Sequence, residues 1–378
     1  MVGPLLDGTW TPISAAGAPS GAGSRLAVWS GTELVVWGGA GGCLPLGLCA
    51  TGARYDPARD AWTAMSTTGA PTARDEQAAT WTSQAVLVWG GRGCNGLTST
   101  CGDGALYNPA NDGWTAISSA GAPAARGWAV GAWTGKEAFV WGGEDPAANQ
   151  VVQTGGLYDP IAGSWRTVPV TGAPGARRYH SVLWSGSTLL VWGGSGGAQS
   201  DVALGDGAAY DPGVNTWRPI AAAGAPAPRW SHSAVWTGSE MVVWGGLGCG
   251  VDSTGAPATC GDGGRYDPAT DRWRPLSSAG APSARVGHTA VWTGRLMIVW
   301  GGMATRCADG SSGACNDGAA YDPAADQWRP LAVSSVAAAR AGHVAAWTGS
   351  SMVVWGGTGA GAAEASLMNG VTFTPATP

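Results

Sequence analysis

The chain has 378 residues, including 64 glycines and 24 prolines, and only 12% of its residues are charged. Because turn-forming residues are frequent and apolar residues make up 44%, the composition excludes long helices and a disordered polyelectrolyte. The net charge of −5 and the scattered basic residues argue against a nucleic-acid surface. Without a long apolar run or a signal-peptide pattern, we expect no membrane insertion and an export signal that was either removed or never existed.

In chain order, the sequence consists of seven copies of one unit with four recurring segments. The first segment contains a tryptophan, at Trp10, Trp62, Trp114, Trp165, Trp217, Trp273 and Trp328. The second ends in Trp29, Trp81, Trp133, Trp184, Trp236, Trp292 and Trp347. The third reads VWGG and carries Trp37, Trp89, Trp141, Trp192, Trp244, Trp300 and Trp355. The fourth reads YDP or a variant of it, at Tyr55, Tyr107, Tyr158, Tyr210, Tyr266, Tyr321 and Phe373. These β-branched and aromatic segments, bounded by Gly, Pro and Asp, predict four short strands per copy.

Length variation is confined to one loop of the repeat. The leading tryptophans recur every 51 to 56 residues, and the variation disappears when the stretch between the double glycine and the tyrosine is left out. This is typical of a fixed structural frame that displays one adjustable loop in each repeat.

The pattern of four strands, a double glycine, a tyrosine and a tryptophan resembles the kelch-repeat family, here of a bacterial type with seven repeats. The resemblance covers essentially the whole chain. It implies an all-β fold, a single seven-bladed β-propeller with four antiparallel strands per blade and one domain over residues 1–378. The N-terminal strand is expected to join the C-terminal blade and close the ring, because neither end of the chain completes a blade alone. The expected blades span 25–66, 77–118, 129–169, 180–221, 232–277, 288–332 and 343–374 with 8–14.

Most repeated residues are expected to be structural. The 21 repeated tryptophans suit the wedge between blades, and the glycines permit close approach. Asp103, Asp206, Asp262 and Asp317 precede the tyrosine strands and are expected to bond to turn amides, with a metal site as the alternative. His180, His232, His288 and His343 share one repeat position and are expected to form hydrogen bonds between blades, with a transition-metal site as the alternative. We therefore expect no metal and no cofactor.

The eight cysteines lie in pairs within the variable loops of four repeats. Their spacings fit no usual zinc pattern, so we expect disulfides that join Cys43 to Cys49, Cys94 to Cys101, Cys249 to Cys260 and Cys307 to Cys315, with free thiols or a metal site as the alternative. Disulfides indicate an oxidising compartment, which is the periplasm, the cell surface or the medium.

Ligand-binding residues are expected where the repeats differ from one another. Arg25, Gln77 and Ala129 stand where later repeats have histidine, and Trp128, Tyr179 and Trp230 are aromatic residues outside the repeated sets. Aromatic faces beside arginines and carboxylates suit a sugar ring or a peptide; the alternative is that Trp128 and Trp230 plug the channel of the propeller. The expected binding residues are Arg25, Arg74, Asp75, Glu76, Arg126, Trp128, Arg177, Arg178, Tyr179 and Trp230.

Three classes of function remain open. The leading one is a secreted or surface binding module, a monomer, that recognises a glycan or protein on the loop-bearing face. A purely architectural repeat protein is the second. An enzyme is the third and less favoured, and the resemblance to kelch propellers implies a copper-radical oxidase, a mutarotase or a glutaminyl cyclase as its type. The oxidases need a tyrosine cross-linked to a cysteine, and here every cysteine has a partner in its own loop. No catalytic residue is assigned.

Overall fold

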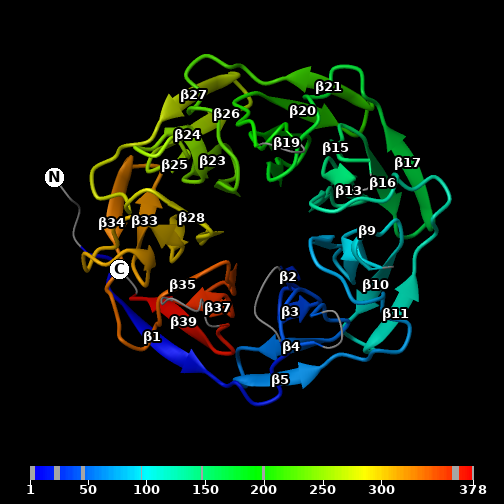
Figure 1. The fold of residues 1–378 in the computed structure, drawn as a ribbon, viewed down its shortest axis with the longest axis horizontal. Coiled ribbons are helices and arrows are strands. Elements are labelled where there is room, and N and C mark those ends of the chain that lie inside the picture. The colour runs from blue at the N-terminus through cyan, green and yellow to red at the C-terminus, as the bar shows by residue number, and fades with distance from the viewer. Residues whose placement is uncertain are drawn as a thin grey trace. The chain divides into compact units, whose positions relative to one another are not determined.

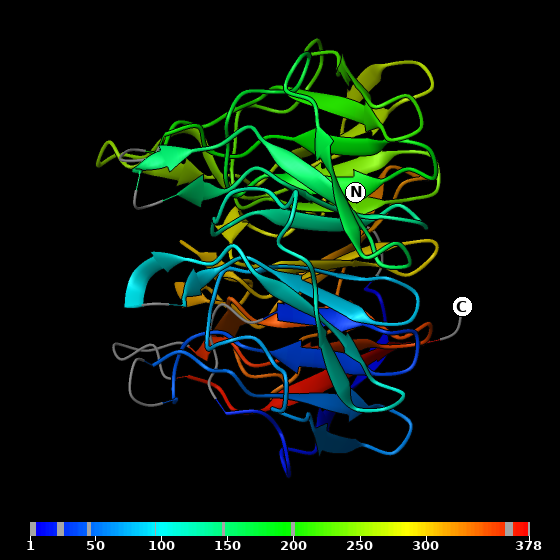
Figure 2. The ribbon, with the colours of Figure 1, turned by 90° about the vertical axis from the view of Figure 1, so that its right-hand side faces the viewer.

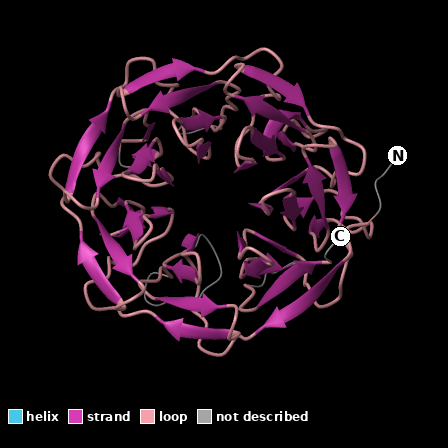
Figure 3. Cartoon of the chain, turned by 180° about the vertical axis from the view of Figure 1, so that it is seen from behind, coloured by secondary structure: helices cyan, strands magenta, loops and turns pink. Residues whose placement is uncertain are grey.

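The computed structural model describes residues 5–20, 26–43, 47–94, 96–145, 148–197, 201–359 and 366–376. Strands and loops, with no helix, make up this described part of the chain (Figure 3). It divides into two compact units, which we call the first unit, Ala16–Ile220, and the second unit, Met1–Ala15 with Ala221–Pro378.

The first unit contains four sheets, each with four antiparallel strands in chain order from the innermost to the outermost. Their strands are β2 (Leu26–Trp29), β3 (Leu34–Trp37), β4 (Gly52–Asp56) and β5 (Ala61–Ala64); β6 (Ala78–Trp81), β7 (Val86–Trp89), β10 (Gly104–Asn108) and β11 (Gly113–Ala116); β12 (Val130–Trp133), β13 (Ala138–Trp141), β16 (Gly155–Asp159) and β17 (Ser164–Val168); and β18 (Ser181–Trp184), β19 (Leu189–Trp192), β20 (Gly207–Asp211) and β21 (Thr216–Pro219). The innermost strands of consecutive sheets contact each other, and the sheets lie side by side (Figure 1).

The second unit contains three sheets of the same kind. Their strands are β22 (Ser233–Trp236), β23 (Met241–Trp244), β26 (Gly263–Asp267) and β27 (Arg272–Pro275); β29 (Thr289–Trp292), β30 (Met297–Trp300), β33 (Gly318–Asp322) and β34 (Gln327–Pro330); and β36 (Val344–Trp347), β37 (Met352–Trp355), β39 (Gly370–Pro375) and β1 (Gly8–Ile13). β1 pairs with β39 so that Trp10 lies opposite Phe373. The predicted fold class, with an N-terminal strand that completes the C-terminal blade, is therefore confirmed. That all 378 residues form one domain with the expected blade boundaries stays a prediction.

Short additional strands extend the variable loops and the turns before the innermost strands. They are β8 (Arg92–Gly93), β9 (Gly96–Thr100), β14 (Glu144–Asp145) and β15 (Gln150–Val151) in the first unit, and β24 (Leu247–Val251), β25 (Pro257–Thr259), β28 (Arg285–Val286), β31 (Met303–Ala304), β32 (Gly313–Ala314), β35 (Arg340–Ala341) and β38 (Thr358–Gly359) in the second. In the first unit the hairpins β8–β9 and β14–β15, cyan and blue-green in Figure 2, project to the same side.

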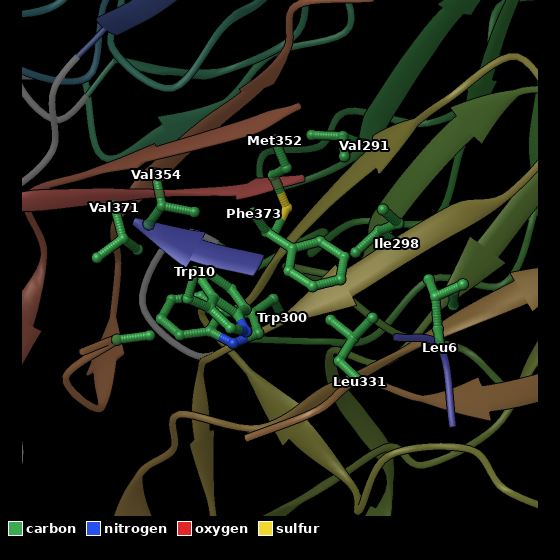
Figure 4. Packing of buried hydrophobic residues seen from close by; sticks show 12 residues of the cluster. Leu6, Trp10, Val291, Ile298, Trp300, Leu331, Met352, Val354, Val371 and Phe373 are labelled. Atoms are coloured by element: carbon green, nitrogen blue, oxygen red, sulfur yellow. The ribbon is translucent and has the colours of Figure 1, made fainter. Parts of the chain in front are cut away.

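The repeated tryptophans join neighbouring sheets within each unit. The VWGG tryptophan of one sheet packs against the outer-strand tryptophan of the next, as Trp89 does with Trp165 at 5.7 Å between ring centres. The outer ring also donates its indole N–H to a carbonyl of the previous sheet, 2.8 Å from Trp165 to Ser118. In the second unit Trp10 packs between Trp300 and Phe373, at 5.1 and 4.9 Å (Figure 4). These rings are core residues, as their regular spacing predicts.

Candidate functional site

The arginines at the repeat position of Arg74 are buried and act as internal clamps. In the described chain this position is held by Arg74, Arg126, Arg177, Arg229, Arg285 and Arg340, with relative exposures of 0 or 1%. Arg177 shows the pattern: its guanidinium donates to the carbonyls of Gly193 and Asp206, at 2.8 and 3.0 Å, and to both carboxylate oxygens of Asp206. This corrects the expectation that Arg74, Arg126 and Arg177 supply donors to a ligand, because a guanidinium without exposed surface does not reach one.

The aspartates before the tyrosine strands are the partners of these arginines. Asp103 pairs with Arg74 at 3.0 Å, Asp262 with Arg229 at 2.8 Å, and Asp317 with Arg285 at 2.7 Å. The expected bond to a backbone amide is present at Asp317, which accepts from the Ala308 amide, but the partner that Asp103, Asp262 and Asp317 share is an arginine. In the repeat of Arg126, Thr154 stands in place of the aspartate and accepts a hydrogen bond from Arg126 at 2.9 Å. Burial lowers the pKa of Arg126 to about 10, so this arginine is still charged at neutral pH.

Two of the repeated histidines form the predicted hydrogen bonds between sheets. His288 Nε2 lies 2.9 Å from Ser233 Oγ, and His343 Nε2 lies 2.8 Å from Thr289 Oγ1, in each case on the preceding sheet. Each ring also packs edge-on against a VWGG tryptophan, His288 against Trp244. Burial lowers the pKa of His288 and His343 to about 3, so both are neutral at pH 7. The close approach of this histidine explains the first glycine of the VWGG segment, since a Cβ on Gly245 would lie 2.5 Å from His288 Cε1.

The residue two positions after each clamp arginine adopts a left-handed backbone conformation. The φ angles are 67° for Gly287 and 62° for Gly342, where glycine suits this conformation. In the earlier repeats the same position holds Glu76, Trp128, Tyr179 and Ser231, with φ of 55°, 55°, 56° and 52°. A bulky side chain at positive φ is uncommon and costs about 1–2 kcal/mol relative to glycine. The first unit therefore carries three strained large side chains on consecutive sheets.

These three side chains line a hollow of about 260 Å³, which we call the Trp128 pocket. Its lining residues are Leu26, Glu76, Gln77, Trp128, Ala129, Val130 and Tyr179. The rings of Trp128 and Tyr179 meet edge to face at 6.0 Å, and both are partly exposed. Burial raises the pKa of the Tyr179 hydroxyl above its usual value, so it is a neutral hydrogen-bond group at physiological pH.

Two arginines stack on the Trp128 ring. The guanidinium carbon of Arg92 lies 4.2 Å from the ring centre and that of Arg178 lies 5.6 Å from it. Arg92 is paired with Asp75 at 3.3 Å. Arg178 is paired with Glu144 and, at 3.1 Å, with Asp201. The sheets that begin with β6, β12 and β18 therefore all contribute charged groups around one indole.

The structure brings together five of the ten predicted binding residues: Asp75, Glu76, Trp128, Arg178 and Tyr179. Trp230 belongs to the second unit, and its relative exposure of 6% corrects the expectation that it offers an aromatic surface. It occupies the repeat position of Asp75 and Arg178, one residue before that of Trp128. Arg25 lies outside the described residues.

The sequence reasoning missed Arg92, Glu144 and Asp201. A signal for the first two was present, because each directly follows the double glycine of its repeat, where the other repeats have an uncharged residue. The backbone explains why this position matters: Asp75 bridges to Arg92, and Gly127 bridges to Glu144. Asp201 lies in the variable loop, whose length differs between repeats, so no repeat position marked it in the sequence.

The predicted cysteine pairs lie at disulfide distance, with Cα separations of 5.2, 5.6, 5.7 and 5.5 Å in chain order. Within the described ranges, two groups combine three potential metal ligands: Cys94, Cys101 and Asp103, and Cys249, Cys260 and Asp262. Both groups contain one of these pairs, and a disulfide has no thiolate to offer a metal. The closed pairs therefore fit a structural role.

Comparison with known proteins agrees with this geometry. The family described as the KLHDC2/KLHL20/DRC7 Kelch-repeats domain matches residues 127–357. The chain belongs to the kelch-repeat family. Kelch propellers generally bind other proteins, which makes a binding module the class of function that the fold itself favours.

Several curated kelch proteins resemble part of the chain. It is 33% identical over 183 residues to Adagio-like protein 3 of Oryza sativa subsp. japonica, and 33% identical over 178 residues to Adagio protein 3 of Arabidopsis thaliana; each match covers 45% of this chain and 27% of the relative. It is 30% identical over 177 residues to Kelch domain-containing protein 3 of Bos taurus, covering 44% and 45%. The chain thus matches less than half the length of these relatives. They come from plants and cattle, so the expectation of a specifically bacterial type is not supported.

Within the described ranges, a search for a helix long and apolar enough to cross a bilayer found none.

Proposed function

We propose that this kelch propeller is a binding module that recognises a partner protein at the Trp128 pocket. The observation that carries the proposal is the left-handed backbone of Trp128, at a position that two other repeats fill with glycine, Gly287 and Gly342. Strain of this kind is kept where the side chain has a task that a smaller residue would not perform. The large rings of Trp128 and Tyr179 are also the residue types that dominate binding energy at protein interfaces.

The carboxylates beside the pocket and, separately, the histidines of the second unit favour binding over catalysis. Asp75 and Glu144 are engaged with Arg92 and Arg178, and His288 and His343 are buried between sheets. Such ion pairs hold the arginines in place against the Trp128 ring, and fixed side chains reduce the entropy lost when a ligand binds. The four cysteine pairs favour an oxidising compartment for the protein, and a glycan is the alternative ligand that the experiment below also covers.

The experiment compares the wild-type protein with the variants Trp128→Gly and Ser231→Gly. Both variants place glycine at the same repeat position, but only the first removes a pocket ring. Each protein is used to capture surface proteins of the producing cells and is applied to a glycan array. We expect Trp128→Gly to lose at least tenfold in binding to the partners of the wild-type protein, while Ser231→Gly keeps them. Unchanged partners and affinities in Trp128→Gly overturn the proposal, and loss of glycan signals alone assigns the pocket to a sugar.

A further inference from the structure

A second hollow of the first unit lies between the sheet of β6, β7, β10 and β11 and the sheet of β12, β13, β16 and β17. It has a volume of about 400 Å³, and we call it the Lys136 pocket. Its wall includes the turns β6–β7, β12–β13 and β16–β17, which share one end of these antiparallel sheets. The variable loops and the turn that carries Trp128 are at the other end, so an inference about this pocket goes beyond the proposed function.

The backbone of Ser83 is left-handed where it lines the Lys136 pocket. Its φ is 72°, whereas the six other repeats have glycine at this position, with φ between 90° and 102°. A residue other than glycine at positive φ is uncommon, and such strain is kept where the side chain has a task. The Ser83 hydroxyl is exposed and has no hydrogen-bond partner among the described residues, so it is available to a ligand of the pocket.

The only charged group in the wall of the Lys136 pocket is an ammonium. Lys136 is the single lysine of the chain, and its repeat position holds Arg295 in the second unit and uncharged residues in the five other repeats. Asn108 also lines the pocket and stands where five other repeats have aspartate. Its side-chain oxygen accepts from the Ala110 amide at 2.9 Å, which leaves its two N–H groups for a ligand. The departures from the repeat at Ser83, Asn108 and Lys136 thus bring hydrogen-bond donors and remove an acid.

The carboxylates next to the pocket have other partners. Glu137 binds the Arg166 guanidinium at 2.6 Å, so these two charges balance. Asp159 is not part of the wall, and its carboxylate accepts from the amides of Ile161 and Ala162 at 2.8 and 2.9 Å. Among the described residues, none forms an ion pair with Lys136. A carboxylate of a ligand therefore complements the Lys136 ammonium.

Lys136 lies between two hollows that each have an exposed aliphatic side chain. Ile161 is 94% exposed in the wall of the Lys136 pocket, at a repeat position that is alanine or glycine elsewhere. Lys136 also lines the hollow on the side of β18 to β21, together with Val214, which is 67% exposed. Exposed aliphatic groups at a hollow mark a surface for apolar side chains of a protein, whereas a sugar ring needs an aromatic face.

We propose that an acidic segment of a protein partner binds across the Lys136 pocket. A glutamate or aspartate of the segment pairs with Lys136, and apolar side chains pack against Ile161 and Val214. Ser83 and Asn108 supply further donors for the same segment. Because alternate residues of an extended chain project to the same side, the order apolar-x-acidic-x-apolar suits this surface.

The test uses the peptides acetyl-Leu-Gly-X-Gly-Leu-amide, with X as Glu, Gln or Lys, and methyl glucuronide as an acidic sugar. Protein labelled with ¹³C at the lysine ε-carbon gives one lysine signal, which reports binding at Lys136 itself. We expect the Glu peptide to shift this signal and to bind at least threefold more tightly than the Gln peptide, with the Lys peptide weakest and with weaker binding at higher salt. No shift with the Glu peptide or equal binding of the Gln peptide overturns the inference. Tighter binding of methyl glucuronide also overturns it and assigns the pocket to an acidic sugar.

The variants Lys136→Gln and Arg295→Gln provide the matched comparison, because both remove one positive charge at the same repeat position, on different units. Binding is followed at the ¹⁵N indole signal of Trp133, which also lines the pocket and is identified from the Trp133→Phe variant. We expect Lys136→Gln to weaken the Glu peptide at least threefold and Arg295→Gln to leave it unchanged. Equal effects of the two variants would contradict a local role of Lys136.

Ser83→Gly separates the task of the serine from its structural role. Glycine relieves the strain at positive φ and removes the hydroxyl. We expect this variant to unfold at no lower temperature than the wild-type protein and to bind the Glu peptide at least twofold more weakly. Unchanged binding would show that Ser83 takes no part in recognition and would remove the strain as support for the site.

Discussion

The guanidinium of Arg92 lies 4.2 Å above the centre of the Trp128 ring, although the two residues belong to different sheets. Arg92 follows the double glycine of its own repeat and begins the hairpin β8–β9, whereas Trp128 stands in the turn before β12. The turns before β6 and β12 are joined through the backbone, since the Trp128 amide donates to the Glu76 carbonyl at 2.9 Å. The turns before β6, β12 and β18 thus contribute Glu76, Trp128 and Tyr179 to the pocket wall, and the hairpin β8–β9 places Arg92 over the Trp128 ring.

Trp128 should tolerate glycine better than alanine. At a φ of 55° an L-residue is strained and glycine is not. Both substitutions remove the ring, so the comparison isolates the backbone. We expect Trp128→Gly to be more stable than Trp128→Ala by about 1 kcal/mol in chemical denaturation. Equal stabilities would show that the backbone at this position is unstrained.

Trp230 should behave as a core residue. Its ring is 6% exposed, so truncation leaves a cavity rather than an open surface. We expect Trp230→Ala to cost about 3–5 kcal/mol of unfolding free energy, close to the cost of truncating the VWGG residue Trp244. Thermal and urea unfolding of both variants measure this. A loss below ~1 kcal/mol would restore Trp230 as a surface residue.

The clamp arginines should matter more than their acidic partners. Replacing Arg177 by Met leaves the carbonyls of Gly193 and Asp206 without their buried donor, which we expect to cost about 2–4 kcal/mol. The Asp206 side chain is 57% exposed, so solvent screens its charge, and Asp206→Asn should cost no more than about 1 kcal/mol. The natural pair of Arg126 with Thr154 supports this order. Denaturation of both variants checks it, and equal losses would contradict it.

Acid should destabilise the second unit through His288 and His343. Their folded pKa of about 3 lies below the ~6.5 of an unfolded histidine, so the unfolded state binds more protons between these values. Their contribution is complete above pH ~6.5 and is lost as the pH falls toward 3, by up to about 1.4 kcal/mol per histidine and pH unit. Unfolding curves from pH 7 to 4 measure the slope. The double variant His288→Gln/His343→Gln should have a flatter profile, and an unchanged slope would rule out these two groups as its source.

Features that recur at a fixed position of the repeat could be predicted from the sequence, whereas the role of a side chain that depends on its contacts in the folded protein could not. Strand order, the pairing of Trp10 with Phe373 and the cysteine partners follow from spacing, because a constant frame places equivalent residues equivalently. The role of Arg177 did not follow, since nothing in a lone arginine distinguishes a buried clamp from a ligand donor until Asp206 is placed beside it. Trp128 and Trp230 looked alike as additional tryptophans, but they differ by one repeat position, and that shift places one ring in a pocket and the other in the core.

The cysteine pairs should resist alkylation in protein purified without reductant. Peptide mapping should find Cys43 joined to Cys49, Cys94 to Cys101, Cys249 to Cys260 and Cys307 to Cys315, because their Cα atoms already lie within the usual disulfide range. Reduction of the Cys94 pair should loosen the hairpin that begins with Arg92. Eight alkylated thiols would remove the argument for an oxidising compartment.

The central claim is that the Trp128 pocket is the recognition site, and partner capture by the variants Trp128→Gly and Ser231→Gly tests it most directly. Both variants place glycine at the same repeat position, but only the first removes a ring from the pocket. We expect Trp128→Gly to bind the partners of the wild-type protein at least tenfold more weakly, and Ser231→Gly to bind them as the wild-type protein does. Equal binding by the wild-type protein and both variants would contradict the account.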